Sequence, residues 1–261
     1  MEEFELDFTK SAQENASYYF DAAKQARKKK AGAEEAISEL EKKLKEAEAK
    51  ESKKEGKTVR LTKKEWYEKF YWFFTSSGFL AIGGRDAVQN ELINSKYFEE
   101  RDLFFHADIF GASVVILKNG VEADENSKEE AAQFAASFSR AWSSGLASAD
   151  VYSLEREKVS KSTNKGYLGT GSFAMSGERL WFKAMPLILY AFLQSDKFVI
   201  VPSKTFERLG IKKAVELRPG NIKKSEAAKK IARMLGYNDI DYIMQHIPSG
   251  SFQLKQSNQN K

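Results

Sequence analysis

The chain has 261 residues, of which 42% are hydrophobic, 13% aromatic and 30% charged, and its formal net charge is +5. That length suffices for one well-buried domain plus an extended element. The chain has no cysteine and only two histidines, His106 and His246, which excludes disulfides, thiolate nucleophiles and cysteine-based zinc sites. We therefore expect no cofactor, no metal and no self-contained enzyme activity.

The charges are unevenly distributed along the sequence. Residues 66–201 carry 14 basic and 17 acidic side chains, whereas residues 202–261 carry 12 and 5. Residues 24–30 and 53–64 form two further basic blocks. Such blocks can bind a polyanion, because each neutralised phosphate releases counterions, but a solvated helix surface explains any one of them equally well.

The sequence gives no sign of a membrane span or of a leader. No stretch approaches the roughly eighteen apolar residues that a span needs, and Met1-Glu2-Glu3-Phe4 lacks the basic and apolar regions of a signal peptide. We expect a soluble, cytoplasmic protein whose partners include no membrane.

The first 62 residues are expected to form a coiled-coil arm. Small and apolar residues alternate there at spacings of four and three, which is an a/d heptad seam and predicts a helix about 54 Å long at about 1.5 Å per residue. Asp7 or Thr9 is the expected N-cap, and the Lys-rich stretch around Gly56 is expected to end the helix. The seam, which only Lys30 interrupts, is Ala12, Ala16, Tyr19, Ala23, Ala26, Lys30, Ala33, Ile37, Leu40, Leu44 and Ala47.

A second helix is expected to lead from the arm into the globular domain. Trp66, Phe70, Phe73 and Phe74 fall at i, i+4, i+7 and i+8, the spacing of one apolar helix face.

The globular part mixes the periods of strands and helices, so the predicted class is α/β (α+β): the coiled-coil arm, one mixed-sheet domain over residues 63–202, and a basic C-terminal strand and helical tail over 203–261. Expected strands are 79–83, 103–107, 113–117, 151–159, 172–182 with a hairpin at Ser176-Gly177, 187–192, 198–201 and 215–217. Expected helices begin at Asp86, with Val88, Leu92 and Ile93 inward, and at a Ser127–Glu130 capping box, with Ala131, Phe134, Phe138 and Ala141 on one side. Two more span 223–235 and, after an Asn238 or Asp239 cap, 240–247.

Two motifs resemble a cofactor-binding or catalytic site, but the residues around each of them argue against that function. Residues 169–174, Gly-Thr-Gly-Ser-Phe-Ala, match the dinucleotide-binding fingerprint, but that fingerprint needs a following helix and the next residues indicate a hairpin. His106 and Asp108 are chemically able to seat a metal or act as a base. A lone histidine beside one carboxylate is more often a structural pair, so a metal-dependent nuclease is disfavoured.

Two segments have the chemistry of a phosphate site. The glycines Gly83-Gly84 before Arg85 and Asp86 would expose backbone N–H groups at a helix start, although an internal Arg85–Asp86 bridge is equally compatible with the sequence. The polar loop 160–166 carries Lys161 and Lys165.

Several of these stretches, taken in order, resemble the RNA-binding domain of the NFACT family. The stretches are Trp66-Tyr67-Glu68-Lys69-Phe70, Gly83-Gly84-Arg85-Asp86 with Gln89-Asn90-Glu91, His106-Ala107-Asp108 with Gly111-Ala112, Val159-Ser160-Lys161, and Gly166-Tyr167-Leu168 with Gly171-Ser172-Phe173. Upstream, Glu14-Asn15-Ala16 with Tyr18-Tyr19 is similar to the start of that family's central coiled coil in its archaeal form.

The resemblance implies a role in ribosome-associated quality control. Family members bind the large ribosomal subunit after a stalled ribosome splits, hold tRNA and promote template-free addition of residues to the trapped nascent chain, while the ribosome supplies the chemistry. Full-length members also carry an N-terminal NFACT domain and a helix-hairpin-helix module, which this sequence lacks. We therefore expect a C-terminal half that needs an N-terminal NFACT partner polypeptide to elongate tails.

The resemblance thus implies an RNA-binding factor that contacts large-subunit rRNA, tRNA or both. Arg85, Lys158, Lys161 and Lys165 are expected to contact phosphates, and the C-terminal lysines form a secondary patch. The alternative is a coiled-coil scaffold that binds ribosomal or other proteins without RNA specificity of its own. The full set of expected RNA-binding residues is Arg85, Asp86, Gln89, Asn90, His106, Lys158, Lys161, Lys165, Tyr167 and Ser172.

Overall fold

The computed structural model describes residues 6–25, 27, 30, 65–163 and 166–258. The chain divides into two units, residues 1–64 and 65–261. Most of the heptad seam and the stretch around Gly56 lie outside the described residues, so the coiled coil stays a prediction.

The first unit contains a helix over residues 12–25 that is capped by the side chain of Ser11. The backbone N–H of Glu14 donates to Ser11 Oγ at 3.3 Å, and the N–H of Ser11 donates to Glu14 Oε2 at 2.8 Å. This reciprocal capping box satisfies two backbone donors at the helix start. The prediction of Asp7 or Thr9 as N-cap is wrong. Asp7 accepts hydrogen bonds from Thr9, and both residues precede Ser11, which caps the helix.

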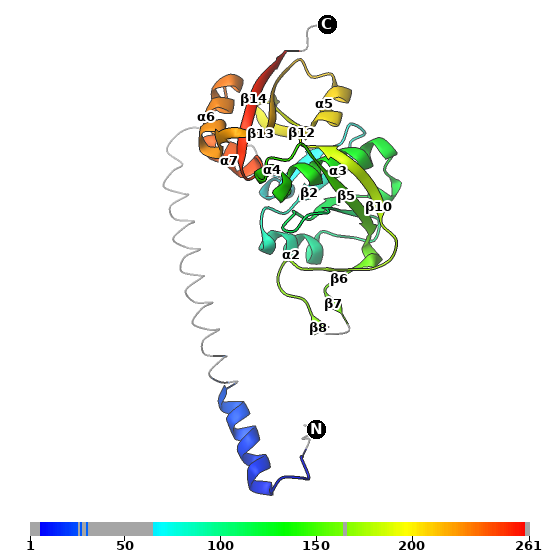
Figure 1. Ribbon diagram of the computed structural model, residues 1–261, viewed down its shortest axis with the longest axis vertical. Coiled ribbons are helices and arrows are strands. Elements are labelled where there is room, and N and C mark those ends of the chain that lie inside the picture. The colour runs from blue at the N-terminus through cyan, green and yellow to red at the C-terminus, as the bar shows by residue number, and fades with distance from the viewer. Residues whose placement is uncertain (1–5, 26, 28–29, 31–64, 164–165, 259–261) are drawn as a thin grey trace. The chain divides into compact units, whose positions relative to one another are not determined.

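The second unit is built on a six-stranded antiparallel sheet (Figure 1). In spatial order its strands are β1 (Tyr71–Phe74), β2 (Leu80–Gly83), β4 (Val115–Leu117), β3 (Leu103–Ala107), β5 (Ser148–Glu155) and β10 (Leu180–Pro186). The register aligns one residue from each strand in the row Tyr71, Gly83, Val115, Phe105, Ser153 and Leu180. A Cβ on Gly83 would lie 3.5 Å from Phe134 of helix α3 (Glu125–Ser137). This row therefore faces α3, and because strand side chains alternate, its immediate neighbours face the opposite side.

Residues 66–74 do not form the expected helix. Trp66–Lys69 is a single 3-10 turn, η1, and β1 follows it directly. The run Tyr71-Trp72-Phe73 is buried throughout, because Phe73 and Tyr71 pack on Phe134 and Phe138 of the α3 side while the intervening side chain faces the other way. A strand that is buried on both faces shows no alternation, and four aromatics in a short window match helical spacing by chance.

The face of the sheet away from α3 is covered in part by two elements. Helix α2 (Ala87–Lys96) starts at Asp86 as expected, and buried Ile93 faces the core, but Val88 is 69% exposed rather than inward. The second element is the segment 156–177, whose Phe173 ring contacts Phe104 edge to face at 6.4 Å. Its short elements are η3 (Arg156–Lys158), β6 (Val159–Ser160), β7 (Ser162–Thr163), β8 (Gly166–Tyr167) and β9 (Ala174–Met175).

The predicted hairpin at Ser176-Gly177 is also wrong. Strand β9 before this turn pairs with β6, whereas β10 after it pairs with β5 in the six-stranded sheet. The two flanking strands thus belong to different sheets.

A second antiparallel sheet has the order β12-β11-β13-β14. It takes strands from both sides of residue 202, where the sequence suggested a boundary. Its strands are β11 (Leu189–Gln194), β12 (Lys197–Pro202), β13 (Lys213–Lys223) and β14 (Ser251–Asn258), and its helices are α5 (Ser203–Leu209), α6 (Lys224–Leu235) and α7 (Ile240–His246). The expected strands 187–192, 198–201 and 215–217 and both terminal helices are confirmed, with Asp239 as the α7 cap, while α5 and β14 were not predicted.

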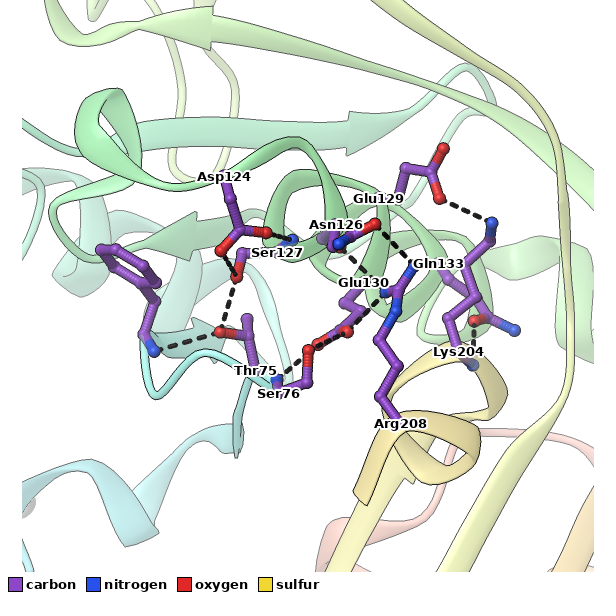
Figure 2. A network of polar contacts seen from close by, with 11 residues as sticks. Thr75, Ser76, Asp124, Asn126, Ser127, Glu129, Glu130, Gln133, Lys204 and Arg208 are labelled. Atoms are coloured by element: carbon purple, nitrogen blue, oxygen red, sulfur yellow. Dashed lines mark hydrogen bonds and ion pairs between the residues drawn. The ribbon is translucent and has the colours of Figure 1, made fainter. Parts of the chain in front are cut away.

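Buried polar contacts join α3 to the second sheet (Figure 2). Glu130, fully buried, accepts hydrogen bonds from the Ser76 N–H at 2.7 Å and from Arg208 of α5 at 2.6 Å. The Gln133 amide donates to the carbonyls of Pro186 and Ile188, which precede β11.

Ser127 and Glu130 do not form the predicted capping box, because Asp124 is the N-cap of α3 and the two side chains bond Thr75 and Ser76 instead. The buried positions of Ala131, Phe134, Phe138 and Ala141 are confirmed. The remaining short helices are η2 (Gly120–Glu122) and α4 (Arg140–Ser143).

Candidate nucleic-acid interface

Arg85, the first residue expected to contact phosphate, is engaged inside the fold. Its Nη2 donates to the backbone carbonyls of Glu68 at 3.2 Å and Phe70 at 3.1 Å and lies 2.9 Å from His246 Nε2. Burial lowers the pKa of Arg85. The guanidinium therefore ties η1 and the residue before β1 to α7, and the alternative of an Arg85–Asp86 bridge is not formed.

The neighbouring predicted residues hold the start of α2 in place. Asp86 caps the helix by accepting the Gln89 N–H at 2.8 Å, and buried Asn90 accepts the Val114 N–H at 3.1 Å. A Cβ on Gly84 would lie 2.1 Å from Asn90 Oδ1, so a glycine is required at this position. The paired glycines thus serve close packing rather than an open anion site.

Lys161, the described lysine of the predicted polar loop, also points inward. Lys161 Nζ contacts Glu91 of α2 at 2.6 Å and the carbonyls of Gly169 and Ser172 at 3.0 and 2.9 Å. Lys158 pairs with Glu155 at 3.2 Å. Arg85 and Lys161 therefore both make internal contacts, and the geometry does not support a phosphate-binding surface centred on them. Lys165 and the side chain of Tyr167 lie outside the described residues.

His106, in contrast, belongs to a row of aromatic rings on the sheet face away from α3. It lies directly opposite Tyr152 of β5, which lies directly opposite Trp181 of β10. The ring centroids of His106 and Tyr152 are 5.8 Å apart, and those of Tyr152 and Trp181 are 5.4 Å apart. We call these three residues the aromatic row. Tyr152 is buried, whereas Trp181, on the edge strand, is 37% exposed.

Two exposed cations flank the open end of the aromatic row. The Arg179 guanidinium lies 4.4 Å from the Tyr152 ring centroid and 5.9 Å from that of Trp181. Lys183 Nζ lies 4.0 Å from the Trp181 centroid and 2.9 Å from Asp150. Cations at these distances are attracted to aromatic faces. The edge of the sheet thus presents an indole between two positive charges.

His106, at the end of the aromatic row opposite Trp181, is uncharged at neutral pH. Burial lowers the pKa of His106, against the opposing effect of backbone hydrogen bonds and of Asp108. Its Nδ1 lies 3.4 Å from the Tyr152 hydroxyl, which donates to Met175 Sδ at 2.8 Å. At neutral pH, His106 therefore supports Tyr152 as an uncharged ring and adds no cation to the surface.

Sequence reasoning missed four of these residues, namely Tyr152, Arg179, Trp181 and Lys183. Arg179, Trp181 and Lys183 stand at i, i+2 and i+4, and Leu180 and Phe182 alternate with them on the α3 side. That alternation would have revealed the surface had the strand been placed at 180–186.

Comparison with known proteins relates part of this fold to a family. Residues 69–177 match the family model of the NFACT protein RNA binding domain. These residues, fewer than half of the chain, are therefore similar to NFACT RNA-binding domains. His106 and Tyr152 lie within the matched residues of the NFACT domain, and the other three residues of the site follow directly after them.

Three relatives are similar to the chain well beyond the matched NFACT domain. The archaeal Rqc2 homolog aRqcH of Methanocaldococcus jannaschii is 38% identical over 76% of this chain and 30% of its own length. The ribosome quality control complex subunit NEMF homolog of Drosophila melanogaster is 37% identical over 75% of this chain and 20% of its own. For the human subunit NEMF the figures are 36%, 63% and 16%. The chain thus spans less than a third of the length of these relatives.

The described residues give no indication of a metal site or of a membrane span. Within them, no group of three or more His, Asp or Glu side chains is placed to hold a metal ion in or around the NFACT domain. The helices of the same residues include none with the length and apolar character of a membrane span.

Proposed function

We propose that this chain is an RNA-binding factor of ribosome-associated quality control. The fly and human relatives are named for ribosome quality control, and the matched domain is named for RNA binding. The observation that carries the proposal is the aromatic row with its two flanking cations. Aromatic rings that stack on bases, next to cations that reach phosphates, are the usual means by which proteins bind unstructured RNA.

The proposed partners are large-subunit rRNA and the tRNA of stalled translation complexes, in the cytoplasm. The chain would dock there and support template-free tailing of nascent chains, leaving the chemistry to the ribosome, so it is not itself an enzyme. An N-terminal NFACT polypeptide is the proposed partner for tail elongation.

The second sheet offers further cations for the RNA backbone. Lys229 and Arg233 stand one helical turn apart on the exposed side of α6, and Lys223 precedes the helix. Among the described residues none of these three side chains has an ion-pair partner. They are available for contacts to phosphate, which position RNA without reading its sequence.

A scaffold that binds proteins through its arm is the second candidate. The first unit favours it with exposed aromatic side chains: Phe8 is 95%, Phe20 72% and Tyr18 65% exposed. Exposed rings of this kind are enriched where proteins meet.

The salt dependence of binding separates the two functions. The full chain is titrated with purified large subunits and with tRNA at about 50 and about 200 mM salt. If about four phosphates are contacted, the affinity falls roughly 50- to 150-fold between these conditions. A hydrophobic arm interface would change little, so an affinity for subunits that is insensitive to salt, together with no affinity for tRNA, would overturn the RNA-binding proposal.

A further inference from the structure

We propose that Trp181 is the stacking platform for one unpaired base of single-stranded RNA, with Arg179 and Lys183 contacting the phosphates on either side of that base. This inference rests on the proposed RNA-binding function and assigns to it a ligand class and a site.

The indole is held ready for stacking before any ligand arrives. Tyr152 supports it edge to face, with 64° between the ring planes, and Tyr152 is itself buried and fixed through Met175 and His106. Trp181 also lies within a strand, where the register fixes its position opposite Tyr152. A ring that is already ordered loses little conformational entropy when it binds, and this preorganisation favours affinity.

The two cations can change partners at little cost. Lys183 and Asp150 form an exposed ion pair, with 63% and 40% of their side chains accessible, and exposed pairs of this kind contribute little to stability. Arg179 contacts the two rings but has no carboxylate partner among the described residues. A base that stacks on the face of the indole covered by Lys183 has to displace the ammonium group, which lies 4.0 Å from the ring centroid. Lys183 and Arg179 are long side chains, so both can then contact the phosphates next to that base.

The charges around the site indicate that stacking, rather than charge, dominates its affinity. Asp150 lies beside Lys183, and Asp108 lies near His106 at the other end of the aromatic row. These two carboxylates offset Arg179 and Lys183, so the site has little net positive charge. Trp181 carries no charge, so we expect its replacement to change the affinity without changing the salt dependence, which Arg179, Lys183 and more distant cations determine together.

Stacking on this ring requires a base that is not already covered. In a duplex each base lies between its neighbours in the stack, whereas in a single strand a base face is accessible. Every base has such a face, so the site discriminates unpaired from paired RNA more strongly than one sequence from another.

The test measures binding of a single-stranded oligouridine, the same chain with abasic sugars, and a matched RNA duplex. The proteins are the full wild-type chain and the variants Trp181→Ala, Trp181→Phe and Leu180→Ala. Leu180 is the matched control, because it is the adjacent residue on β10, is 50% exposed and faces the α3 side. Circular dichroism and a thermal melt show that each variant is folded, and Trp181→Phe retains a ring in case the alanine variant is not.

We expect Trp181→Ala to weaken binding of the oligouridine roughly 5- to 150-fold, Trp181→Phe to weaken it less, and Leu180→Ala to change it less than about twofold. The salt slope should be the same in all four proteins. Wild-type affinity for the abasic chain should match that of Trp181→Ala for the oligouridine, and duplex binding should not respond to Trp181.

Two results would overturn the inference, and only the second would also overturn the proposed function. If wild-type protein binds RNA but Trp181→Ala binds it as Leu180→Ala does, the site is wrong and the proposed function stands. If the wild-type chain binds none of the three RNAs and neither large subunits nor tRNA, the proposed function fails together with the site.

Discussion

At the scale of single residues, the same side-chain types serve opposite purposes in this molecule. Arg85 and Lys161 are directed inward onto carbonyls and a carboxylate, whereas Arg179 and Lys183 stand at an open sheet edge. Residue type alone does not distinguish the two cases, because a guanidinium or ammonium binds a carbonyl oxygen and a phosphate oxygen through the same donors. The surrounding backbone decides which one it meets.

The first prediction concerns Arg85. Replacing it with Gln removes the donor that bridges Glu68, Phe70 and His246, and we expect a loss of about 2 kcal/mol in the free energy of unfolding because buried acceptors lose their partner. RNA affinity, measured well below the melting temperature, should stay within about twofold of the wild type. Lys96→Gln, at an exposed position, is the control for removing one positive charge. Weaker RNA binding with unchanged stability would instead show that Arg85 contacts phosphate.

The second prediction follows from the buried His246. Its Nδ1 lies 2.7 Å from the Tyr242 carbonyl, which can only accept, so Nδ1 carries the proton of the neutral ring. Nε2 then accepts from Arg85 at 2.9 Å, and the Glu68 carbonyl, 3.1 Å from Nε2, accepts from Arg85 as well. Burial, together with the nearby Arg85, lowers the pKa of His246 from 6.5 to about 4. The unfolded chain thus takes up this proton before the folded chain does. The stability that neutral His246 contributes is complete above pH 6.5 and is lost as the pH falls toward 4.

We expect the wild type to lose about 2 kcal/mol of unfolding free energy through this group between about pH 7 and about pH 5. His246→Gln starts less stable but lacks the titration, so its own loss should be smaller by that amount, as measured by urea unfolding at both pH values. His106 contributes equally to the pH dependence of both proteins, so it does not affect the difference between their losses. Equal losses in the two proteins would contradict the assigned protonation state.

At the scale of elements, helix α3 connects the two sheets of the second unit. One of its faces packs on the six-stranded sheet, while Glu130 accepts the Ser76 N–H of the β1–β2 turn and Gln133 accepts the Lys204 N–H of α5 (Figure 2). Gln133 also donates to the carbonyls of Pro186 and Ile188. A fully buried carboxylate is costly unless all its oxygens are paired, and Ser76 and Arg208 provide those partners.

Glu130→Gln should therefore lower the free energy of unfolding by about 2–4 kcal/mol, because the new amide N–H₂ meets donors on Ser76 and Arg208. Glu129→Gln is the matched control. The Glu129–Lys204 pair is one position away and its carboxylate side chain is 40% exposed, so its loss should amount to about 0.5 kcal/mol. Urea unfolding gives both values. Equal effects of the two substitutions would show that α3 does not depend on this contact.

Some helices and strands could be predicted from the sequence pattern and others could not. Strand 103–107, the α2 cap at Asp86 and the amphipathic helix α6 were predictable because a clear period or cap marks each. Residues 66–74 were not, because burial on both faces removes the alternation that identifies a strand.

At the scale of the whole molecule, the class and most elements could be predicted, but the pairing of strands could not. Strand β14 closes the second sheet against β13, from Lys223 opposite Ser251 to Lys213 opposite Asn258, so the paired residues are 28 to 45 positions apart in the sequence. Strand β10 completes the first sheet beside β5. Local sequence does not encode such partners. The aromatic row was missed for the same reason, since its three rings come from strands β3, β5 and β10 and meet only through the register.

A fragment of residues 65–261 tests how much each of the two units contributes to the RNA affinity. It contains every strand of both sheets, so we expect it to unfold in one cooperative transition. It should keep the Trp181-dependent part of the RNA affinity while losing the part contributed by the basic blocks at 24–30 and 53–64. A folded fragment without RNA affinity would place binding in the first unit and favour the scaffold.

Ultraviolet crosslinking of the full chain in cells, with the attached RNA sequenced and the crosslinked peptide identified, shows whether the open edge of the six-stranded sheet contacts ribosomal RNA or tRNA. We expect large-subunit rRNA or tRNA attached to peptides that contain Tyr152 or Trp181. Crosslinks confined to residues 1–64, or peptides from β5 and β10 that carry no RNA while other peptides do, would contradict it.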